Sequence, residues 1–269
     1  MANRLEAHEM ASQPIYQFYA VLDDYKPIIW RRFQVPGNVT IARLAYIVMT
    51  LFEMKASHLF AVEVPFSDNF LEEIRRKSPN DSDVAAAEKA LAGVHSVWRY
   101  ELLDFESDSF GDPKENRVFD ATKSNIAKTI QHPGDKLSLN YDFGDDWWVS
   151  LTLESVTKNA ALPGSELPHA LEGAGFGIIE DCGGTPGLAE LAAVFTKKKG
   201  TLYENLRDWL GMDELDMTTA FDIDDMNFRL KKLPRIYKQI YEDRLEPTQR
   251  SIALIERKYA QQTKNRRKS

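Results

Sequence analysis

One stretch of the sequence decides the fold class, residues 137–153, which read LSLNYDFGDDWWVSLTL. Apolar and polar residues alternate in Leu137–Tyr141 and again in Trp148–Leu153, the period expected of a strand with one buried face. Five of the six residues between these runs, Asp142–Asp146, are a glycine, three aspartates and a phenylalanine, a composition typical of a turn. The stretch therefore predicts an antiparallel β-hairpin with an acidic turn.

Further strands are predicted mainly in the first part of the chain. Ile15–Leu22 and Ile28–Val35 are rich in aromatic and β-favouring residues, and a turn that contains Pro27 separates them. We expect these two segments to pair as a hairpin. His58–Val64 and Val97–Leu103 are also apolar and aromatic, and each is predicted to be a strand.

Helices are predicted mainly in the last part. Thr40 is a suitable N-cap for a helix over 41–54, whose apolar residues recur at three- and four-residue spacing. The polar, alanine-rich stretch 66–92 fits an excursion from the sheet with two short helices, at 69–77 and 82–92. The other predicted helices are 120–130, 188–195, 201–210, 222–233 and one or two within 235–258. Residues 160–186, rich in glycine and proline, predict no regular element.

Strands early in the chain and helices late are typical of an α+β protein. We expect an antiparallel β-sheet core with packed helices and a helical C-terminal part. Four segments follow from this division: a disordered N-terminus (1–13), an α+β core (14–187), a helical part packed on the core (188–256) and a basic tail (257–269).

The composition is that of an ordinary globular protein, 43% hydrophobic and 28% charged. No run approaches the roughly 20 consecutive apolar residues that cross a bilayer. The acidic residues Glu6 and Glu9 do not fit a secretory signal. The one cysteine, Cys182, has no internal disulfide partner, which fits a reducing compartment. We therefore expect a cytoplasmic protein that makes no contact with a membrane.

The charge is unevenly distributed. The net charge of −7 disfavours a general nucleic-acid-binding surface. Residues 257–269, by contrast, carry basic residues and no acidic one: Arg257, Lys258, Lys264, Arg266, Arg267 and Lys268. This tail is the part of the chain through which nucleic acid could be contacted. The alternative is that it is a solvated, frayed terminus.

The acidic turn is the first candidate site. Asp142, Asp145 and Asp146 lie within five residues beside Trp147, and carboxylate oxygens hold hard divalent cations or basic partners. The spacing is not that of an EF-hand loop. The alternative is structural, with Gly144 supplying a positive φ, the aspartates bonding to their own turn and the aromatic rings packed in the core.

The second candidate is Glu180-Asp181-Cys182-Gly183-Gly184. A lone Cys182 could act as a nucleophile with a histidine as base, but a single cysteine is more often a small buried residue. His58, just ahead of a predicted strand, has a core position as its alternative role. Zinc-site spacings and glycine-rich phosphate fingerprints are both absent from the sequence. We therefore assign no catalytic residue and predict no metal and no cofactor.

Four motifs occur in order: KPIIWRRFQVP at 26–36, SHL at 57–59, YDFGDDW at 141–147 and EDCGG at 180–184. This series resembles the plasmid pRiA4b ORF-3-like protein family. DWLG at 208–211 and FDIDDMN at 221–227 are similar to the helical C-terminal part of that family. The resemblance runs from about Ile15 to Leu233. It implies an α+β fold with an antiparallel sheet and an association with plasmids and transposable elements, and it implies no particular reaction.

This chain departs from the family pattern at two positions. Many relatives have a second histidine two residues after the first, where this chain has Phe60. Many also have a cysteine five residues before the cysteine of the EDCGG motif, where this chain has Gly177. A metal site built from both histidines and both cysteines would therefore have lost two ligands here.

Two functions fit these observations. The first is a non-enzymatic binding or interaction module with an unidentified macromolecular partner, associated with mobile genetic elements. The alternative is a hydrolase or phosphotransfer enzyme assisted by a divalent metal held by the acidic clusters and His58. The candidate binding residues are His58, Asp142, Asp145, Asp146, Trp147, Glu180, Asp181 and Cys182. The two acidic motifs must share one face of the molecule if the alternative is correct.

Overall fold

The computed structural model describes residues 14–78, 80–94, 96–103, 117–157, 167–218 and 221–257. The predicted disordered segment 1–13 and the basic tail after Arg257 lie outside these ranges. The strands are β1 (Ile15–Leu22), β2 (Trp30–Pro36), β3 (Phe60–Val64), β4 (Trp98–Glu101), β5 (Arg117–Asp120), β6 (Lys136–Tyr141), β7 (Trp147–Thr157) and β8 (His169–Ala174). The helices are α1 (Ile41–Leu51), α2 (Phe66–Lys77), α3 (Asp81–Leu91), α4 (Ile126–Thr129), α5 (Gly184–Lys197), α6 (Thr201–Leu210), α7 (Ile223–Leu230), α8 (Leu233–Tyr241) and α9 (Gln249–Ile255).

The described strands form one sheet in the order β5-β4-β3-β6-β7-β1-β2-β8. The two predicted hairpins are both present, β1 with β2 and β6 with β7. In the second hairpin Tyr141 pairs with Trp147 and Leu139 with Val149, so the acidic residues lie in the turn. The α+β class predicted from the sequence is confirmed.

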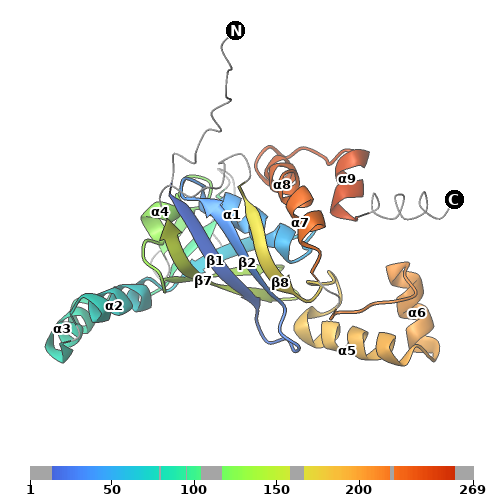
Figure 1. The fold of residues 1–269 in the computed structure, drawn as a ribbon, viewed down its shortest axis with the longest axis horizontal. Helices are drawn as coiled ribbons and strands as arrows, with labels where there is room; N and C mark the ends of the chain where they lie inside the picture. Colours follow the sequence, from blue (N-terminus) through green and yellow to red (C-terminus); the bar gives the residue numbers. More distant parts are fainter. Residues whose placement is uncertain are drawn as a thin grey trace, which may run out of the picture.

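The core lies between the sheet and α1 (Figure 1). Alternate residues of each central strand face this side, for example Phe18 in β1 and Val149 in β7, which are fully buried. Thr40 caps α1 as predicted, with its hydroxyl accepting a hydrogen bond from the Arg43 N–H at 3.1 Å. Apart from Arg43, every residue of α1 is buried, because the sheet lies on one side and α7 and α8 pack on the other.

Several features of the sheet and helices differ from the sequence-based expectation. The helix predicted over 120–130 is the short α4, since Asp120 belongs to β5, and the helix predicted over 222–233 ends at Leu230. The sheet is mixed, since β4 and β5 run parallel. Two strands, β5 and β8, were not predicted: β5 has four residues, too few to establish a period, and β8 lies in the glycine-rich stretch at the end of the described sheet. Finally, α5 begins at Gly184 rather than Leu188, with Pro186 in its first turn, where its missing N–H costs nothing.

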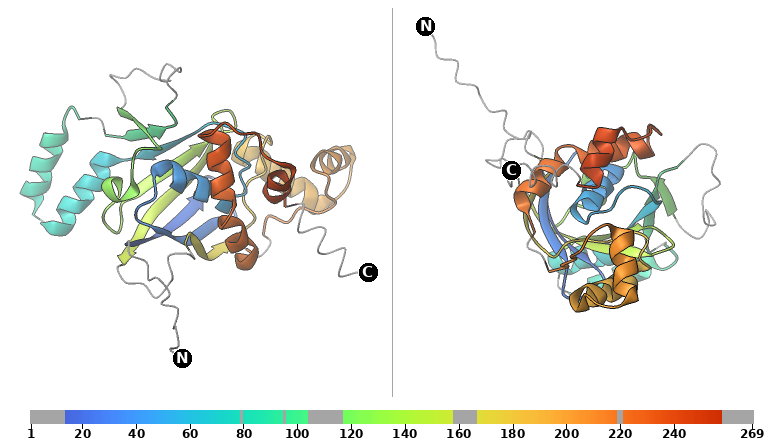
Figure 2. Two further views of the ribbon diagram at one scale, coloured as in Figure 1. Left: turned by 90° about the horizontal axis from the view of Figure 1, so that it is seen from above. Right: turned by 90° about the vertical axis from the view of Figure 1, so that its right-hand side faces the viewer.

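Two helical hairpins extend from the body in different directions, α2–α3 and α5–α6 (Figures 1 and 2). The first is the predicted excursion between β3 and β4. In contrast, α7 and α8 contact α1. Among the described residues, no helix combines the length and apolar character needed to cross a lipid bilayer.

A buried arginine joins β2 to the segment that follows β8. The Arg31 guanidinium donates hydrogen bonds of 2.7–3.0 Å to carbonyl oxygens of five residues: Trp30, Leu51, Ala174, Gly175 and Phe176. The rings of Phe52 and Phe221 cover it, at 5.2 and 4.3 Å from the guanidinium carbon. Arg31 therefore ties the end of α1 to residues 174–176, from which the chain continues to the second acidic motif.

Candidate functional site

Three pairs of consecutive residues, far apart in the sequence, meet at one place. The pairs are Ser57-His58 before β3, Tyr141-Asp142 at the end of β6 and Glu180-Asp181 in the loop before α5. The first member of each pair joins a hydrogen-bond network centred on Glu180. The second members gather beside this network. The two acidic motifs therefore lie side by side on one face.

Glu180 is the centre of the inner network. Its buried carboxylate accepts hydrogen bonds from the Lys55 N–H at 2.6 Å, from the Ser57 hydroxyl at 2.7 Å and from the Tyr141 hydroxyl. Burial, and then the charge of Glu180, raise the pKa of Tyr141 far above its usual range, so the phenol stays a donor. Glu180 thus holds together the backbones that carry the three outer residues.

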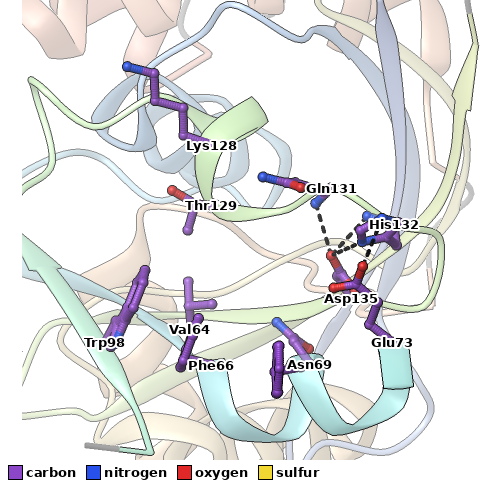
Figure 3. Close-up of a pocket in the computed structure, with 11 residues that line it drawn as sticks. Val64, Phe66, Asn69, Glu73, Trp98, Lys128, Thr129, Gln131, His132 and Asp135 are labelled. Carbon is purple, nitrogen blue, oxygen red and sulfur yellow. Dashed lines mark hydrogen bonds and ion pairs between the residues drawn. The ribbon is translucent and has the colours of Figure 1, made fainter. Parts of the chain in front are cut away.

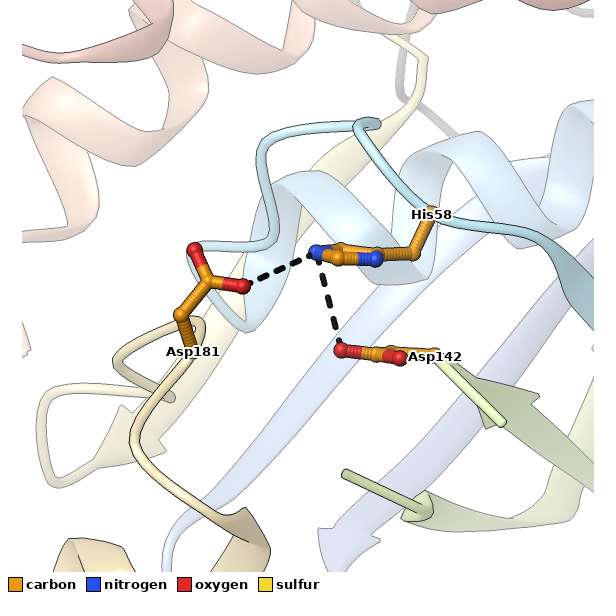
Figure 4. A group of neighbouring side chains, drawn as sticks. All are labelled: His58, Asp142 and Asp181. Carbon is orange, nitrogen blue, oxygen red and sulfur yellow. Dashed lines mark ion pairs between the residues drawn. The ribbon is translucent and has the colours of Figure 1, made fainter. Parts of the chain in front are cut away.

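The outer residues, His58, Asp142 and Asp181, form what we call the surface triad (Figure 4). The His58 Nε2 atom lies 3.5 Å from Asp142 Oδ2 and 3.4 Å from Asp181 Oδ1. The side chains of His58, Asp142 and Asp181 are 29%, 11% and 70% exposed, so the triad opens to solvent mainly on the Asp181 side. The rings of His58 and Tyr141 pack edge to face, with their centroids 5.8 Å apart.

The backbone at both aspartates of the triad is in the left-handed region, with φ of 57° at Asp142 and 60° at Asp181. This conformation is uncommon for residues with a side chain and costs on the order of 1 kcal/mol. It turns the chain directly after the buried Tyr141 and Glu180, and Asp142 and Asp181 face His58.

Helix α8 supports the backbone at and before His58. The Tyr237 hydroxyl donates to the Met54 carbonyl at 2.6 Å, and the Tyr241 hydroxyl donates to the carbonyl of His58 itself. Both tyrosines lie on α8, four residues apart, so they share one face of that helix. The sequence did not lead us to predict a role for either tyrosine. Their four-residue spacing in an amphipathic helix was the signal that could have indicated one.

The other predicted site residues lie beside the triad in different roles. Asp145 accepts from the Gly183 N–H at 3.1 Å, and Asp146 accepts from Asn140 and from the Trp148 indole, each at 2.8 Å. These bonds join the two acidic loops and close the hairpin turn. Trp147 is fully buried in the core.

The two acidic loops approach so closely that one glycine is required. A Cβ atom on Gly184 would lie 2.3 Å from the Asp145 carbonyl oxygen, and its φ is +69°. Glycine at this position therefore allows the second acidic motif to pack on the hairpin turn.

Cys182 is half-buried, and its thiol donates to the Gly184 carbonyl at 3.7 Å. Burial, and then the charge of Asp145, raise the pKa of Cys182 to about 12. The thiol is therefore protonated at neutral pH, which does not suit a nucleophile.

We predict that iodoacetamide at pH 8 modifies Cys182 at least about 100-fold more slowly in the native protein than in denaturant, because the reactive thiolate is scarce. Mass spectrometry of quenched time points measures both rates on the same chain. Equal rates in the two states would contradict the raised pKa.

The two positions that depart from the family pattern serve packing here. Phe60 is buried, and its ring contacts those of Tyr46 and Tyr241 edge to face. At Gly177, with φ of +144°, a Cβ atom would lie 2.6 Å from the Phe52 carbonyl oxygen. A cysteine at this position would clash with the backbone.

The surface triad has the spacing of a metal site. Its three ligand atoms all lie within 4.8 Å of one another, the one such group found in the described residues. Zn²⁺ bonds of 2.0–2.1 Å in a tetrahedron place ligand atoms about 3.3–3.4 Å apart. The two distances from His58 Nε2, 3.4 and 3.5 Å, match that edge and exceed an ordinary N–H···O hydrogen bond.

A separate hollow of about 140 Å³ lies between α2 and the segment before β6 (Figure 3). Phe66 and Trp98 stack in parallel on one side, 4.1 Å apart. The carboxylates there already have partners: Asp135 accepts from two backbone N–H groups, and Glu73 pairs with Lys77. None of its lining residues belongs to the sequence motifs.

The region that carries these motifs matches a known protein family. The family model described as plasmid pRiA4b ORF-3-like protein matches residues 14–229. The chain belongs to this family. All three pairs of the site in this pRiA4b ORF-3-like protein fall inside the matched region, whereas α8, with its two supporting tyrosines, lies beyond it.

A protein of unknown function from Methanosarcina mazei Go1 has a similar crystal structure, with a TM-score of 0.56 and 22% sequence identity. The similarity covers 79% of this chain and 96% of the Methanosarcina mazei chain, and it concerns the fold. A search of the curated proteins finds no match.

Proposed function

We propose that this protein is a binding module whose centre, the surface triad, holds one divalent transition-metal ion. The observation that carries the proposal is that His58 Nε2 lies 3.5 Å from an Asp142 oxygen and 3.4 Å from an Asp181 oxygen, close to the edge of a tetrahedral zinc site, with all three atoms within 4.8 Å of one another. An imidazole together with carboxylates favours Zn²⁺ or a similar ion over Mg²⁺ and Ca²⁺, which prefer oxygen ligands alone.

The surroundings of the triad support the same proposal. Glu180 and α8 hold the three ligand backbones in place before any ion binds, which lowers the ordering cost of binding. Asp142 is largely buried, so its charge is poorly screened by water and gains from a bound cation. In this proposal the α+β core carries the triad and the helical C-terminal part holds its His58 in place, so the two parts act as one unit.

The proposed partner is bound through the ion. Three protein ligands leave coordination positions open, and the 70% exposure of Asp181 places those positions toward solvent. An oxygen donor from a partner could occupy them. The family name supports a proposed association with plasmids, and the single cysteine supports a proposed cytoplasmic location.

Calorimetric titration with Zn²⁺ tests the proposal. We expect one ion per chain at the triad, and His58→Ala or Asp142→Ala should weaken binding by about 100-fold or more, because each removes a ligand. Asp146→Asn is the matched control, an acidic residue of the same turn whose carboxylate bonds to Asn140 and Trp148 instead. It should change affinity by less than about threefold.

Two results would contradict the proposal: no Zn²⁺ binding by the wild-type chain, or equal binding by wild type and His58→Ala. Circular dichroism of each variant ensures that affinities are compared between folded proteins.

The open coordination positions also support a second candidate function, a metal-assisted hydrolase or phosphotransfer enzyme, since catalytic zinc sites keep such positions for water. Hydrolysis of bis(4-nitrophenyl) phosphate by the Zn²⁺-loaded protein, lost in Asp142→Ala, would favour it. Equal rates with and without the ion would count against it.

A further inference from the structure

An apolar groove lies between α5 and α6, in the helical hairpin at the lower right of Figure 1. Its volume is about 280 Å³. The apolar lining comes from both helices, with Leu191 on α5 and with Leu202, Leu206 and Trp209 on α6. Because the hairpin extends from the body of the molecule, the groove lies away from the main core (Figures 1 and 2).

The apolar face of α6 is incompletely covered by the rest of the protein. Leu202, Leu206 and Trp209 recur at four- and three-residue spacing, so they share one face of this helix. Helix α6 packs mainly on α5, none of its residues is buried, and Leu202 and Trp209 are each 50% exposed. A surface helix normally buries such a face, because burial removes apolar area from water. The groove therefore lacks a cover among the described residues.

The shape of the groove fits a helix. Leu202 and Trp209 lie about two helical turns apart, which corresponds to roughly 10 Å along α6. A groove of this kind between two helices accepts an amphipathic helix, whose own apolar residues recur at three- and four-residue spacing. The half-exposed side chains are then buried against that stripe.

The charges at the groove restrict the partner. Its two charged lining residues, Asp181 and Glu190, are both acidic and both exposed. The carboxylate of Glu190 has no ion-pair or hydrogen-bond partner in the part of the chain that the structure describes. The lysines at 197–199 lie at the far end of α5, outside the lining. Face-to-face pairing of two copies would set these acidic residues against each other, whereas a helix with lysines or arginines beside its apolar stripe is attracted.

We infer that the groove binds an amphipathic basic helix of a partner protein, with the apolar stripe of that helix on Leu206 and Trp209 and its basic residues beside Asp181 and Glu190. This contact needs no ion at the surface triad, so it goes beyond the proposed cation site. It gives the macromolecular partner of the binding module a defined chemical character.

Fluorescence anisotropy with a labelled peptide tests this binding on the full chain, in the presence of a metal chelator. The probe is the leucine–lysine peptide LKKLLKLLKKLLKL, which has the pattern of an amphipathic basic helix. We expect one peptide to bind per chain, with an affinity that falls as salt is added. The peptide LEELLELLEELLEL, in which glutamate replaces lysine, should bind at least about tenfold more weakly.

Two matched pairs of variants locate the binding site. Leu202→Ala should weaken binding of the lysine peptide at least about fivefold, whereas Leu245→Ala, at a leucine of similar exposure (54%) after α8, should change it less than about twofold. Glu190→Lys should also weaken it at least about fivefold, whereas Glu246→Lys, which changes the net charge equally outside the groove, should not. All four positions are exposed, so each variant should fold.

Several results would overturn the inference: no binding of the lysine peptide, equal binding of the two peptides, or equal affinity in the groove variants and their controls. A dimer in analytical ultracentrifugation that Leu202→Ala abolishes would also overturn it, because a second copy then covers the groove. So would peptide binding that appears only after residues 258–269 are removed, because the basic tail is then the occupant. Zn²⁺ titration is a separate measurement, so failure of the cation site leaves these outcomes unchanged.

Discussion

Arg31→Met should lower the free energy of unfolding by about 3–5 kcal/mol, the largest effect that we expect of a single substitution in this protein. The guanidinium of Arg31 is fully buried and donates hydrogen bonds to the carbonyl oxygens of five residues. Methionine fills a similar volume but donates no hydrogen bond, so buried carbonyl groups lose their partner. Urea unfolding followed by tryptophan fluorescence measures the difference.

Arg32→Met is the matched control for this prediction, on the same strand and with the opposite orientation. The Arg32 side chain lies on the outer face and pairs with Glu154 and Glu172. Water still reaches these partly exposed ion pairs, so Arg32→Met should lose clearly less stability than Arg31→Met. Similar losses in the two variants would show that the buried hydrogen bonds of Arg31 do not carry the effect.

Glu180→Ala should cost about 3 kcal/mol or more and should also weaken Zn²⁺ binding at least about tenfold. The substitution leaves the Tyr141 hydroxyl, the Ser57 hydroxyl and the Lys55 N–H without their buried acceptor. It also releases the three backbones that carry the triad, although Glu180 itself does not belong to it. Chemical unfolding and Zn²⁺ calorimetry measure the two effects separately.

Asp181→Asn is the control, at the neighbouring residue. Its side chain is exposed, and asparagine tolerates the left-handed backbone at this position. We expect the free energy of unfolding of the metal-free protein to change by less than about 1 kcal/mol, while Zn²⁺ affinity falls. A folded Glu180→Ala variant with wild-type Zn²⁺ affinity would show that Glu180 does not position the triad.

Local patterns in the sequence predicted much of the fold. The period-two alternation at 137–153 predicted the β6–β7 hairpin, and Thr40 with its following apolar spacing predicted the start of α1. These predictions succeeded because neighbouring residues determine turns, caps and amphipathic faces. In contrast, β8 has little pattern of its own and is held by pairing with β2 and by hydrogen bonds from Arg31 to its last residue and the two that follow.

The candidate site could be predicted in part. The sequence identified both acidic motifs and His58, and the structure brings them together on one face. It could not tell which carboxylates face His58. Asp142 and Asp181 face His58 Nε2 at 3.5 and 3.4 Å, whereas Asp145 accepts a hydrogen bond from Gly183 and Asp146 accepts from Asn140 and Trp148.

The sequence by itself therefore determined the α+β class, the hairpin with its acidic turn and the family to which the chain belongs. The tertiary structure alone decided that Glu180 is a buried acceptor and that the exposed side chain of its neighbour Asp181 faces His58. The physical reason is that these roles depend on partners distant in the chain: Ser57 and Glu180 are 123 positions apart, and Tyr141 and Glu180 are 39 apart. Contacts over such separations leave no periodic signal in the sequence, because they arise only when the sheet and its loops have assembled.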